Sequence, residues 1–453
     1  MKSKFKGKIT LFMASFMLIT MLSSCSTKEI EAAKQIEDYM QGQEQQLKRY
    51  TNIEIDKLDT QNAMDMIVEF ASDKYKGRKT GTEENEKAVQ YIADYFKRIG
   101  LENPSSLNNY MQPYSQSVTL LEKTPTLEVI DEDGKLIKNY EYPKNFVFTV
   151  LSDRTEDIHL NAPMKLMESI SDIKANSFKK DSVLLISLKA QGRIPSMELM
   201  RQAYPTKAAA IIVEMDVNGE NSISSDLKVI PMYSRNWGKS YKPVIGVDTL
   251  TFAELAAASQ ENKKIALQCS YTINEKYKAS NIVGYIPGID EKLKDEFIIV
   301  GAHMDHVGDN FNGTYNPGAL DNASGTAAMM EIARVISQST VKPMKSILFI
   351  AFNGESSGQQ GSRYYANHPI YPMDKAVMIN LDMVGSAREM PLLIANPENK
   401  SSTKNNVLSD TFAEYAKKLS INYTIGHESG SDHLSFAAED VPSVLLTHLD
   451  FEN

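Results

Sequence analysis

The chain contains 453 residues, of which 42% are hydrophobic and 24% are charged. This is the composition of a globular protein, and the length is that of two domains rather than one. The formal net charge of −9 argues against a nucleic-acid-binding protein, because such a protein needs a basic face.

The first 24 residues have the pattern of an export signal. Four lysines between positions 2 and 8 precede the apolar run ITLFMASFMLITML, which is too short for a comfortable membrane span. The run ends at Leu-Ser-Ser-Cys25, which resembles a bacterial lipobox, and an ordinary secretory signal with an incidental cysteine is the alternative. The lipobox predicts cleavage before Cys25, lipidation of its thiol and a protein anchored on the outer face of the bacterial cell membrane. Residues 25–58 are then a polar spacer.

Two helices are predicted in residues 59–108. Asp59, Thr60 and Asn62 are candidate N-caps for a helix through MDMIVEFAS. Apolar residues at helical spacing predict a second helix, capped by Thr82 and ending near Gly100. This second helix needs a partner surface such as a sheet.

Residues 109–275 alternate short strand-like runs with turns, and we predict a separate, inserted β-rich domain. Within it, MELMRQAYPTKAAAIIVEM is expected to form a helix that leads into a strand. His, Cys and acidic residues do not cluster at ligand spacing here, so chemistry is expected elsewhere. Cys269 lies in an alternating run and is expected to be a buried, inert thiol; with Cys25 lipidated, no disulfide is available.

Residues 276–453 alternate strands with helices. The predicted strands are FIIVGAH, SILFIAF, AVMINLDMV and PSVLLTH, and ASGTAAMMEIARVISQ is the clearest helix. Near-continuous apolar strands of this kind predict an α/β fold with a mostly parallel, doubly covered sheet. Together with residues 59–108, this segment would form one discontinuous domain whose site lies beyond the carboxyl ends of the strands.

Acids and histidines follow several of these strands. His303, Asp305 and His306 follow FIIV, Glu355 follows SILFIAF, and Asp382 stands in NLDMVG, while Asp321 precedes the predicted helix. His nitrogen and Asp oxygen are standard zinc ligands, and an acid beside the metal that is not a ligand can take a proton from water. Asp305 is spaced to accept the second N–H of His303. For His306 and His433 a hydrogen-bonding role is preferred over a metal-binding one.

The run GAHMDHVG, GALDNASG, FNGE, NLDMVG and SGSDH resembles the exopeptidase family with two co-catalytic zinc ions. That family includes bacterial aminopeptidases, glutamate carboxypeptidases and the transferrin receptor ectodomain, and segment 109–275 resembles its protease-associated domain. The resemblance implies that His303 and Asp382 ligate one zinc and that Asp321 bridges both. It also implies that Asp305 orients His303 and that Glu355 is the general base. The implied substrate is a peptide, attacked at its N-terminus.

Two departures concern the second zinc. The family has a ligand Glu directly after its general base, where this chain has Ser356. The family's last ligand His lies beyond the Ser-Asp-His motif, and here only His448 is a candidate. We therefore expect about one bound zinc, with the second site weak or empty. Two alternatives stay open: a non-catalytic binding module on the same fold, and an acyltransferase of the single-zinc glutaminyl-cyclase type.

Overall fold

The computed structural model describes residues 58–150, 157–167, 169, 182–191, 206–215, 242–386, 390–397, 403–428 and 430–448. The predicted export signal, Cys25 and nearly all of the spacer lie outside these residues. The helix expected in the segment MELMRQAYPTK falls largely outside them as well. The strand expected to follow that helix is β7 (Ala210–Glu214).

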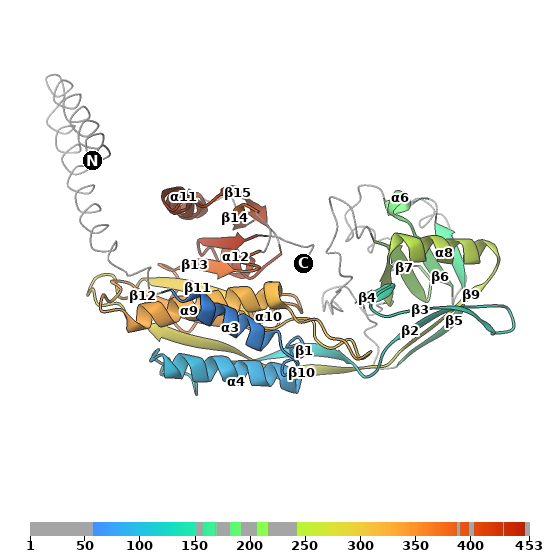
Figure 1. The fold of residues 1–453 in the computed structure, drawn as a ribbon, viewed down its shortest axis with the longest axis horizontal. Helices are drawn as coiled ribbons and strands as arrows, with labels where there is room; N and C mark the ends of the chain where they lie inside the picture. The colour runs from blue at the N-terminus through green and yellow to red at the C-terminus, as the bar shows by residue number, and fades with distance from the viewer. Residues whose placement is uncertain are drawn as a thin grey trace, which may run out of the picture. The chain divides into compact units, whose positions relative to one another are not determined.

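The domain that carries the predicted site is built on an eight-stranded sheet (Figure 1). In spatial order its strands are β1 (Met111–Leu121), β10 (Tyr271–Ile286), β12 (Ser346–Phe352), β11 (Phe297–His303), β13 (Val377–Leu381), β16 (Ser443–Thr447), β14 (Leu392–Pro397) and β15 (Tyr423–Glu428). The four central strands, from β12 to β16, are parallel, and antiparallel pairs flank them on both sides. The four strands predicted in residues 276–453 are β11, β12, β13 and β16. The sheet is mixed, with its parallel part at the centre.

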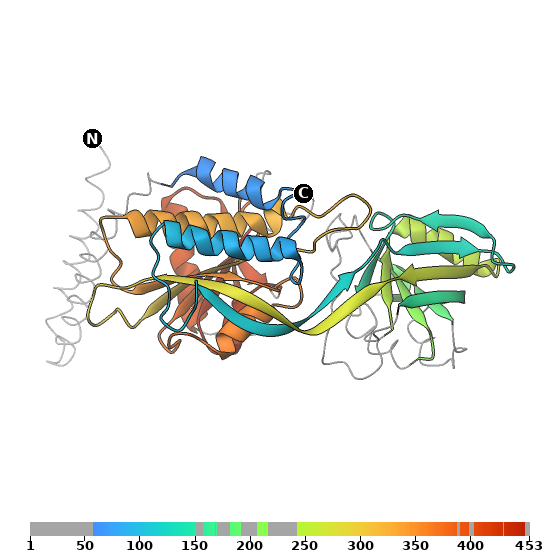
Figure 2. The same cartoon turned by 90° about the horizontal axis from the view of Figure 1, so that it is seen from below.

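Helices cover both faces of this sheet, as predicted (Figure 2). One face packs against α3 (Thr60–Phe70), α4 (Glu83–Arg98) and α9 (Gly325–Gln338) through side chains such as Ile282, Phe349 and Ala351. The other face packs against α10 (Gln360–Asn367) and α12 (His433–Ala438) through Leu348 and Ile350 among others. Alternate residues of β12 therefore belong to two separate hydrophobic cores, as expected for a strand with no solvated face. Helix α11 (Thr403–Lys418) packs near β14 and β16.

The two N-terminal helices begin at the predicted caps. The Asp59 side chain accepts hydrogen bonds from the backbone amides of Gln61 and Asn62 at the start of α3. Thr82 accepts one from the amide of Asn85 at the start of α4. A side-chain oxygen at this position satisfies a backbone N–H that the helix leaves unpaired. Three glutamates in the first turn of α4 and two cations in its last turn also suit the helix dipole.

A second eight-stranded sheet lies within the predicted insert. Its spatial order is β3 (Leu136–Tyr140), β2 (Thr126–Ile130), β9 (Lys264–Cys269), β5 (Ile158–Met167), β6 (Val183–Ile186), β7, β8 (Val244–Val247) and β4 (Phe146–Val150). Two helices accompany it, α6 (Leu188–Gln191) and α8 (Thr249–Gln260). These strands run from Thr126 to Cys269, whereas β1 pairs with β10 in the first sheet. The second sheet thus occupies a shorter stretch of sequence than the segment 109–275, and the first part of that segment, which contains β1, belongs to the first sheet.

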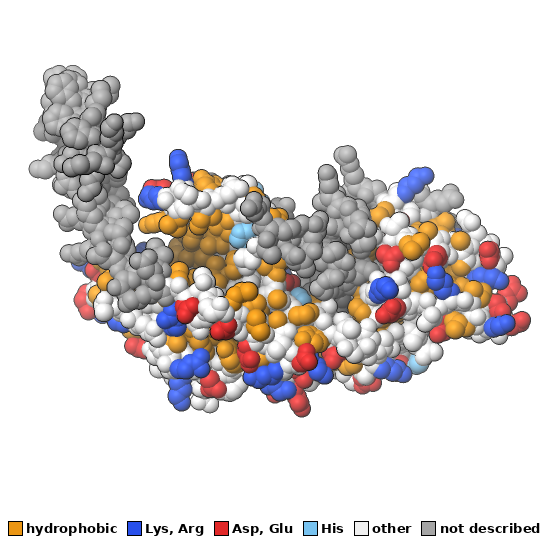
Figure 3. Space-filling view, viewed as in Figure 1, with side chains coloured by type: hydrophobic (Ala, Val, Ile, Leu, Met, Phe, Trp, Pro, Cys, Tyr) orange, Lys and Arg blue, Asp and Glu red, His pale blue; other side chains and the backbone are white. Residues whose placement is uncertain are grey.

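Charged side chains of both signs are interspersed on the face drawn in Figure 3. Among the described residues, no helix is both long enough and apolar enough to cross a membrane.

Candidate metal centre

Three of the predicted site residues come from the carboxyl ends of three neighbouring parallel strands. His303 is the last residue of β11 and lies opposite Phe352, the last residue of β12. Glu355 follows β12 by three residues, and Asp382 directly follows β13. Parallel strands bring these ends to the same edge of the sheet, so the topology alone gathers the three side chains.

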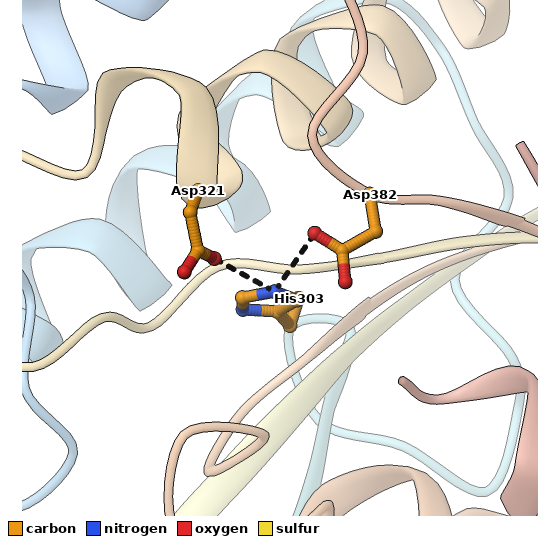
Figure 4. A group of neighbouring side chains, drawn as sticks. All are labelled: His303, Asp321 and Asp382. Carbon is orange, nitrogen blue, oxygen red and sulfur yellow. Dashed lines mark ion pairs between the residues drawn. The ribbon is translucent and has the colours of Figure 1, made fainter. Parts of the chain in front are cut away.

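His303, Asp321 and Asp382 form one cluster (Figure 4). The Nε2 atom of His303 lies 3.3 Å from Oδ1 of Asp321 and 3.4 Å from Oδ1 of Asp382. One ligand atom from each residue lies within 4.8 Å of the others. The His303 side chain is 1% exposed, whereas that of Asp321 is 45% exposed. The cluster is therefore buried on the side of His303 and open to solvent on the side of Asp321.

The other ring nitrogen of His303 is fixed by the main chain. Nδ1 lies 3.1 Å from the backbone carbonyl oxygen of Asp305, and since a carbonyl only accepts, Nδ1 carries the proton. In the neutral ring, the form that ligates a metal, the lone pair is then on Nε2, which faces the cluster. The carboxylate of Asp305, predicted to accept this N–H, is 4.0 Å from Nδ1. Asp305 does orient the ring, but it does so through its backbone.

The Asp305 carboxylate instead holds the loop that carries Glu355. Its two oxygens accept hydrogen bonds from the backbone amides of Glu355 at 3.0 Å and Ser356 at 3.1 Å. Glu355 Oε2 thereby lies 3.9 Å from Nε2 of His303, beside the cluster. Asp305 is fully buried, so this pair of hydrogen bonds satisfies a carboxylate that would otherwise be costly to desolvate.

Asp321 lies in a short helical segment, η2 (Ala319–Ser324), that leads into α9. The backbone of Asp321 and Asn322 leaves helical angles there, which turns the Asp321 carboxylate toward His303. The buried Asn322 side chain supports this turn. It donates to the carbonyl of Leu381 at 2.9 Å and accepts from the amides of Gly325 and Met383. Asn322 thus connects the Asp321 turn to the residues on both sides of Asp382.

The two oxygens of Asp382 have different surroundings. Ser431 donates a hydrogen bond to Oδ2 at 2.6 Å, and Asn380 in turn donates to Ser431 Oγ at 2.6 Å. Oδ1 is buried and has no hydrogen-bond donor among the described residues. The roles of Asn322 and Ser431 were not predicted from the sequence. Both stand inside the sequence motifs noted above, but their partners are far away in sequence.

Several carboxyl groups lie close together at the site and shift the pKa values of their neighbours. Burial lowers the pKa of His303, but Asp382, Glu355 and Asp321 outweigh burial and hold that pKa well above its usual range. For Glu355, burial raises the pKa, His303 opposes the rise, and Asp432, Asp382 and Asp305 add to it. The pKa of Glu355 therefore lies well above its usual range. A field of this sign attracts a cation to the space between the acids and Nε2.

The residues present fit a zinc ion. A tetrahedral ion with ligand bonds of about 2.1 Å separates neighbouring ligand atoms by about 3.4 Å, close to the distances from Nε2 to the two Asp oxygens. The buried Oδ1 of Asp382, which lacks a donor, is explained by such an ion. His303, Asp321 and Asp382 supply three ligands, as in catalytic sites that keep one position open.

The other candidates lie around the cluster. His306 Nδ1 is 3.5 Å from Oδ2 of Asp321. His433 is buried at the start of α12 and bonds through Nε2 to the carbonyl of Glu428 at 3.1 Å. His448 accepts a hydrogen bond at Nδ1 from the Gly385 amide at 3.2 Å. Among the described residues, none of these histidines belongs to the three-residue cluster.

This combination of fold and site defines an α/β protein with a candidate metal centre at the ends of parallel strands. Residues 281–453 match the model of peptidase family M28. The co-catalytic zinc exopeptidase resemblance is thereby confirmed.

Two curated proteins match parts of the chain. The chain is 31% identical over 269 residues to Aminopeptidase YwaD of Bacillus subtilis, a match that covers 59% of this chain and 54% of that protein. It is 29% identical over 167 residues to Leupeptin-inactivating enzyme 1 of Streptomyces exfoliatus, covering 36% of this chain and 34% of that protein. The chain thus spans about half, or less, of the length of these two relatives.

Solved structures show the same fold over most of the chain. An aminopeptidase from Aneurinibacillus sp. strain AM-1 superposes with a TM-score of 0.63 at 23% identity, covering 88% of this chain and 87% of that one. BSAP, a zinc aminopeptidase from Bacillus subtilis, gives a TM-score of 0.61 at 22% identity, with 87% of both chains covered. At these identities the similarity establishes the architecture.

Proposed function

We propose that this protein is a zinc-dependent exopeptidase that hydrolyses peptides from their N-termini. The observation that carries the proposal is the position of Glu355, whose Oε2 lies 3.9 Å from His303 Nε2 in the three-residue cluster. An acid beside a metal site that is not itself one of the three ligands is the arrangement a general base requires. The relatives named above support the choice of an aminopeptidase-type substrate.

The residues divide the work as follows. A zinc ion held by His303, Asp321 and Asp382 would polarise the scissile carbonyl and acidify a water molecule. Glu355 accepts a proton from the attacking water and delivers it to the departing amine. Asp305 keeps Glu355 in place through the two backbone amides of its loop, and its backbone carbonyl fixes the tautomer of His303.

The test is hydrolysis of a panel of aminoacyl chromogenic substrates by wild type and Glu355→Gln. We expect the variant to lose about 10²- to 10⁴-fold in kcat while its zinc content stays unchanged. Glu291→Gln is the matched control, since the Glu291 side chain is 85% exposed, forms an ion pair with Lys294 and is not among the cluster residues. Equal background rates for wild type and Glu355→Gln would instead support a binding module. Cyclisation of glutaminyl peptides without hydrolysis would support the acyltransferase alternative.

We further propose that the second zinc site of the family is impaired. Ser356 stands next to the general base, where the family has a ligand Glu, and a neutral hydroxyl is a poor zinc ligand. Metal analysis of purified protein should give about one zinc per chain. Two tightly bound ions would contradict the proposal. Ser356→Glu should raise the zinc content, because it returns a carboxylate to this position.

The export signal, the lipid on Cys25 and the protease-associated character of segment 109–275 remain part of the same proposal. The first two rest on the lysine-rich start, the apolar run and the Leu-Ser-Ser-Cys25 sequence. Cys25→Ser should move the protein from the membrane fraction of expressing bacteria to the soluble fraction. An unchanged distribution would reject the lipid anchor.

A further inference from the structure

Arg78 is the largest side chain in the described part of the chain that is completely buried. Its guanidinium donates four hydrogen bonds, all to backbone carbonyl oxygens. Nη1 bonds to Phe70 at 2.6 Å and Pro317 at 2.8 Å, Nη2 to Gly318 at 2.9 Å, and Nε to Met304 at 2.8 Å. No ion pair links Arg78 to an acid among the described residues. A buried cation without a paired acid is costly, so its position requires an explanation.

Three of the four carbonyls that Arg78 binds belong to the two segments that carry the metal ligands, and the fourth, that of Phe70, is at the end of α3. Met304 lies between His303 and Asp305. Pro317 and Gly318 directly precede η2, which contains Asp321. The rigid guanidinium group therefore bonds both to the segment that carries His303 and to the segment that carries Asp321, the more exposed carboxylate.

Gly318 makes room for this contact. Its φ is +59°, and a Cβ atom there would lie 2.7 Å from Nη2 of Arg78 and 2.7 Å from Cδ2 of His306. Only a residue without a side chain lets the guanidinium reach the carbonyl at this turn.

The segment that carries Arg78 is itself fixed to the active edge of the sheet. Asn85 donates from Nδ2 to the carbonyl of Arg78 at 2.9 Å and to Oδ1 of Asn353 at 3.0 Å. Asn353 follows β12 and stands two residues before Glu355. Asn85 thus links the backbone of Arg78 to the loop that carries the general base.

The charge of Arg78 also suits this place. Burial lowers its pKa to about 10, and Asp321 and Asp305 act in the opposite direction, so the guanidinium stays charged at neutral pH. Arg78 therefore offsets part of the repulsion among the clustered carboxylates without occupying a ligand atom.

We propose that Arg78 is a positioning residue of the metal centre, which sets the separation between the His303 segment and the Asp321 turn by binding the carbonyls of both. This inference rests on the zinc site of the proposed function. It assigns a metal-site role to the N-terminal helical segment, which supplies none of the ligands.

The test compares zinc binding by wild type, Arg78→Lys and Arg78→Met, measured by competition with a chelator of known affinity. We expect the affinity of Arg78→Met to fall by about 10- to 100-fold, the usual effect of losing a residue that orients a ligand. Arg78→Lys keeps the charge and the apolar stem but loses the fork, so it should recover only part of the affinity. Arg334→Met, which removes an arginine from the α9 surface, should bind zinc as wild type does.

A second readout separates positioning from general stability. Unfolding is followed for each protein with and without zinc. Replacing a merely structural residue would lower the free energy of unfolding equally with and without zinc. A tenfold loss of zinc affinity would instead remove about 1.4 kcal/mol of the stabilisation that zinc confers. Unchanged zinc affinity in the folded variants would overturn the inference. Failure of Arg78→Lys to fold would also overturn it, because Arg78 would then be a requirement of folding rather than of the metal centre. Absence of zinc binding by wild type would instead reject the proposed function.

Discussion

At the scale of single residues, the ligand atoms are selected by hydrogen bonds to atoms that face away from the metal. His303 presents Nε2 because Nδ1 is bonded to a backbone carbonyl, and Asp382 presents Oδ1 because Ser431 occupies Oδ2. The sequence pointed to the ligands, since acids and His directly after apolar strands are unusual. It could not point to Ser431, because a serine 49 residues away from Asp382 in sequence carries no local signal of that contact.

Replacing Ser431 by Ala should therefore weaken zinc binding by about 10- to 100-fold, because Asp382 loses the donor that fixes its orientation. The measurement is zinc affinity by chelator competition. Ser435→Ala is the matched control: Ser435 is also buried and on the same segment, but it pairs with Ser362 rather than with a ligand. Equal affinities for the two variants would show that Asp382 is oriented by the backbone alone.

His433 should give the protein a specific pH dependence. Burial lowers the pKa of this ring to about 4 from an ordinary value of 6.5. Because the unfolded chain takes up the proton first, His433 stabilises the fold above pH 6.5 and loses that contribution as the pH falls to about 4. The lost free energy of unfolding is on the order of 3 kcal/mol.

The measurement for His433 is denaturant unfolding of metal-free protein across this pH range, for wild type and His433→Gln. The Gln variant keeps an N–H donor for the Glu428 carbonyl but does not titrate, so its stability should fall less steeply with decreasing pH. The comparison between the two proteins is needed because burial raises the pKa of Asp432 to about 7, and this acid titrates in the same range. Parallel curves for both proteins would contradict the prediction.

At the scale of elements, the strands and helices around the site were predictable because their patterns are local. The caps Asp59 and Thr82, the strands β11, β12, β13 and β16, and helix α9 all follow from hydrophobic runs and capping residues. The interruption of η2 at Asp321 was not predictable. Asp321 and Asn322 leave helical angles and meet partners at the ends of β11 and β13, and these partners come close only once the sheet is assembled.

Gly325 sets the distance between α9 and β13. A Cβ atom there would lie 2.2 Å from the carbonyl oxygen of Leu381 and 2.4 Å from Oδ1 of Asn322. Gly325→Ala should lower the free energy of unfolding by about 1–3 kcal/mol, because the helix must move away from the strand. It should also weaken zinc binding, since Asp321 and Asp382 flank this contact.

Urea unfolding of metal-free protein measures the first effect of Gly325→Ala, and chelator competition measures the second. Gln338→Ala, at the exposed other end of α9, should change stability by less than about 0.5 kcal/mol. A Gly325→Ala protein as stable as wild type would mean that α9 can shift without cost.

At the scale of the whole molecule, the sequence indicated a β-rich segment between two parts of an α/β domain, and the structure has two eight-stranded sheets. The limits of the second sheet were harder to predict. Strand β10 has 16 residues; it pairs with β1 from Tyr271 to Ile282 and with β12 from Ile282 to Ile286. The alternating pattern of a long strand is the same whichever sheet the strand belongs to, so the sequence does not show where one sheet ends and the other begins.

Cys269 provides a probe of the second sheet. It is 1% exposed in the core of that sheet, and burial raises the pKa of its thiol to about 12. The thiolate is the reactive form, so native protein should not react with a thiol reagent at neutral pH. We expect Cys25→Ser protein to show no reactive thiol when native and one per chain when unfolded, since the sequence contains two cysteines. Additional replacement of Cys269 by Ala should abolish the signal in both states. Rapid labelling of the native Cys25→Ser chain would mean that the second sheet opens readily around β9, and that its core is less closed than the burial of Cys269 indicates.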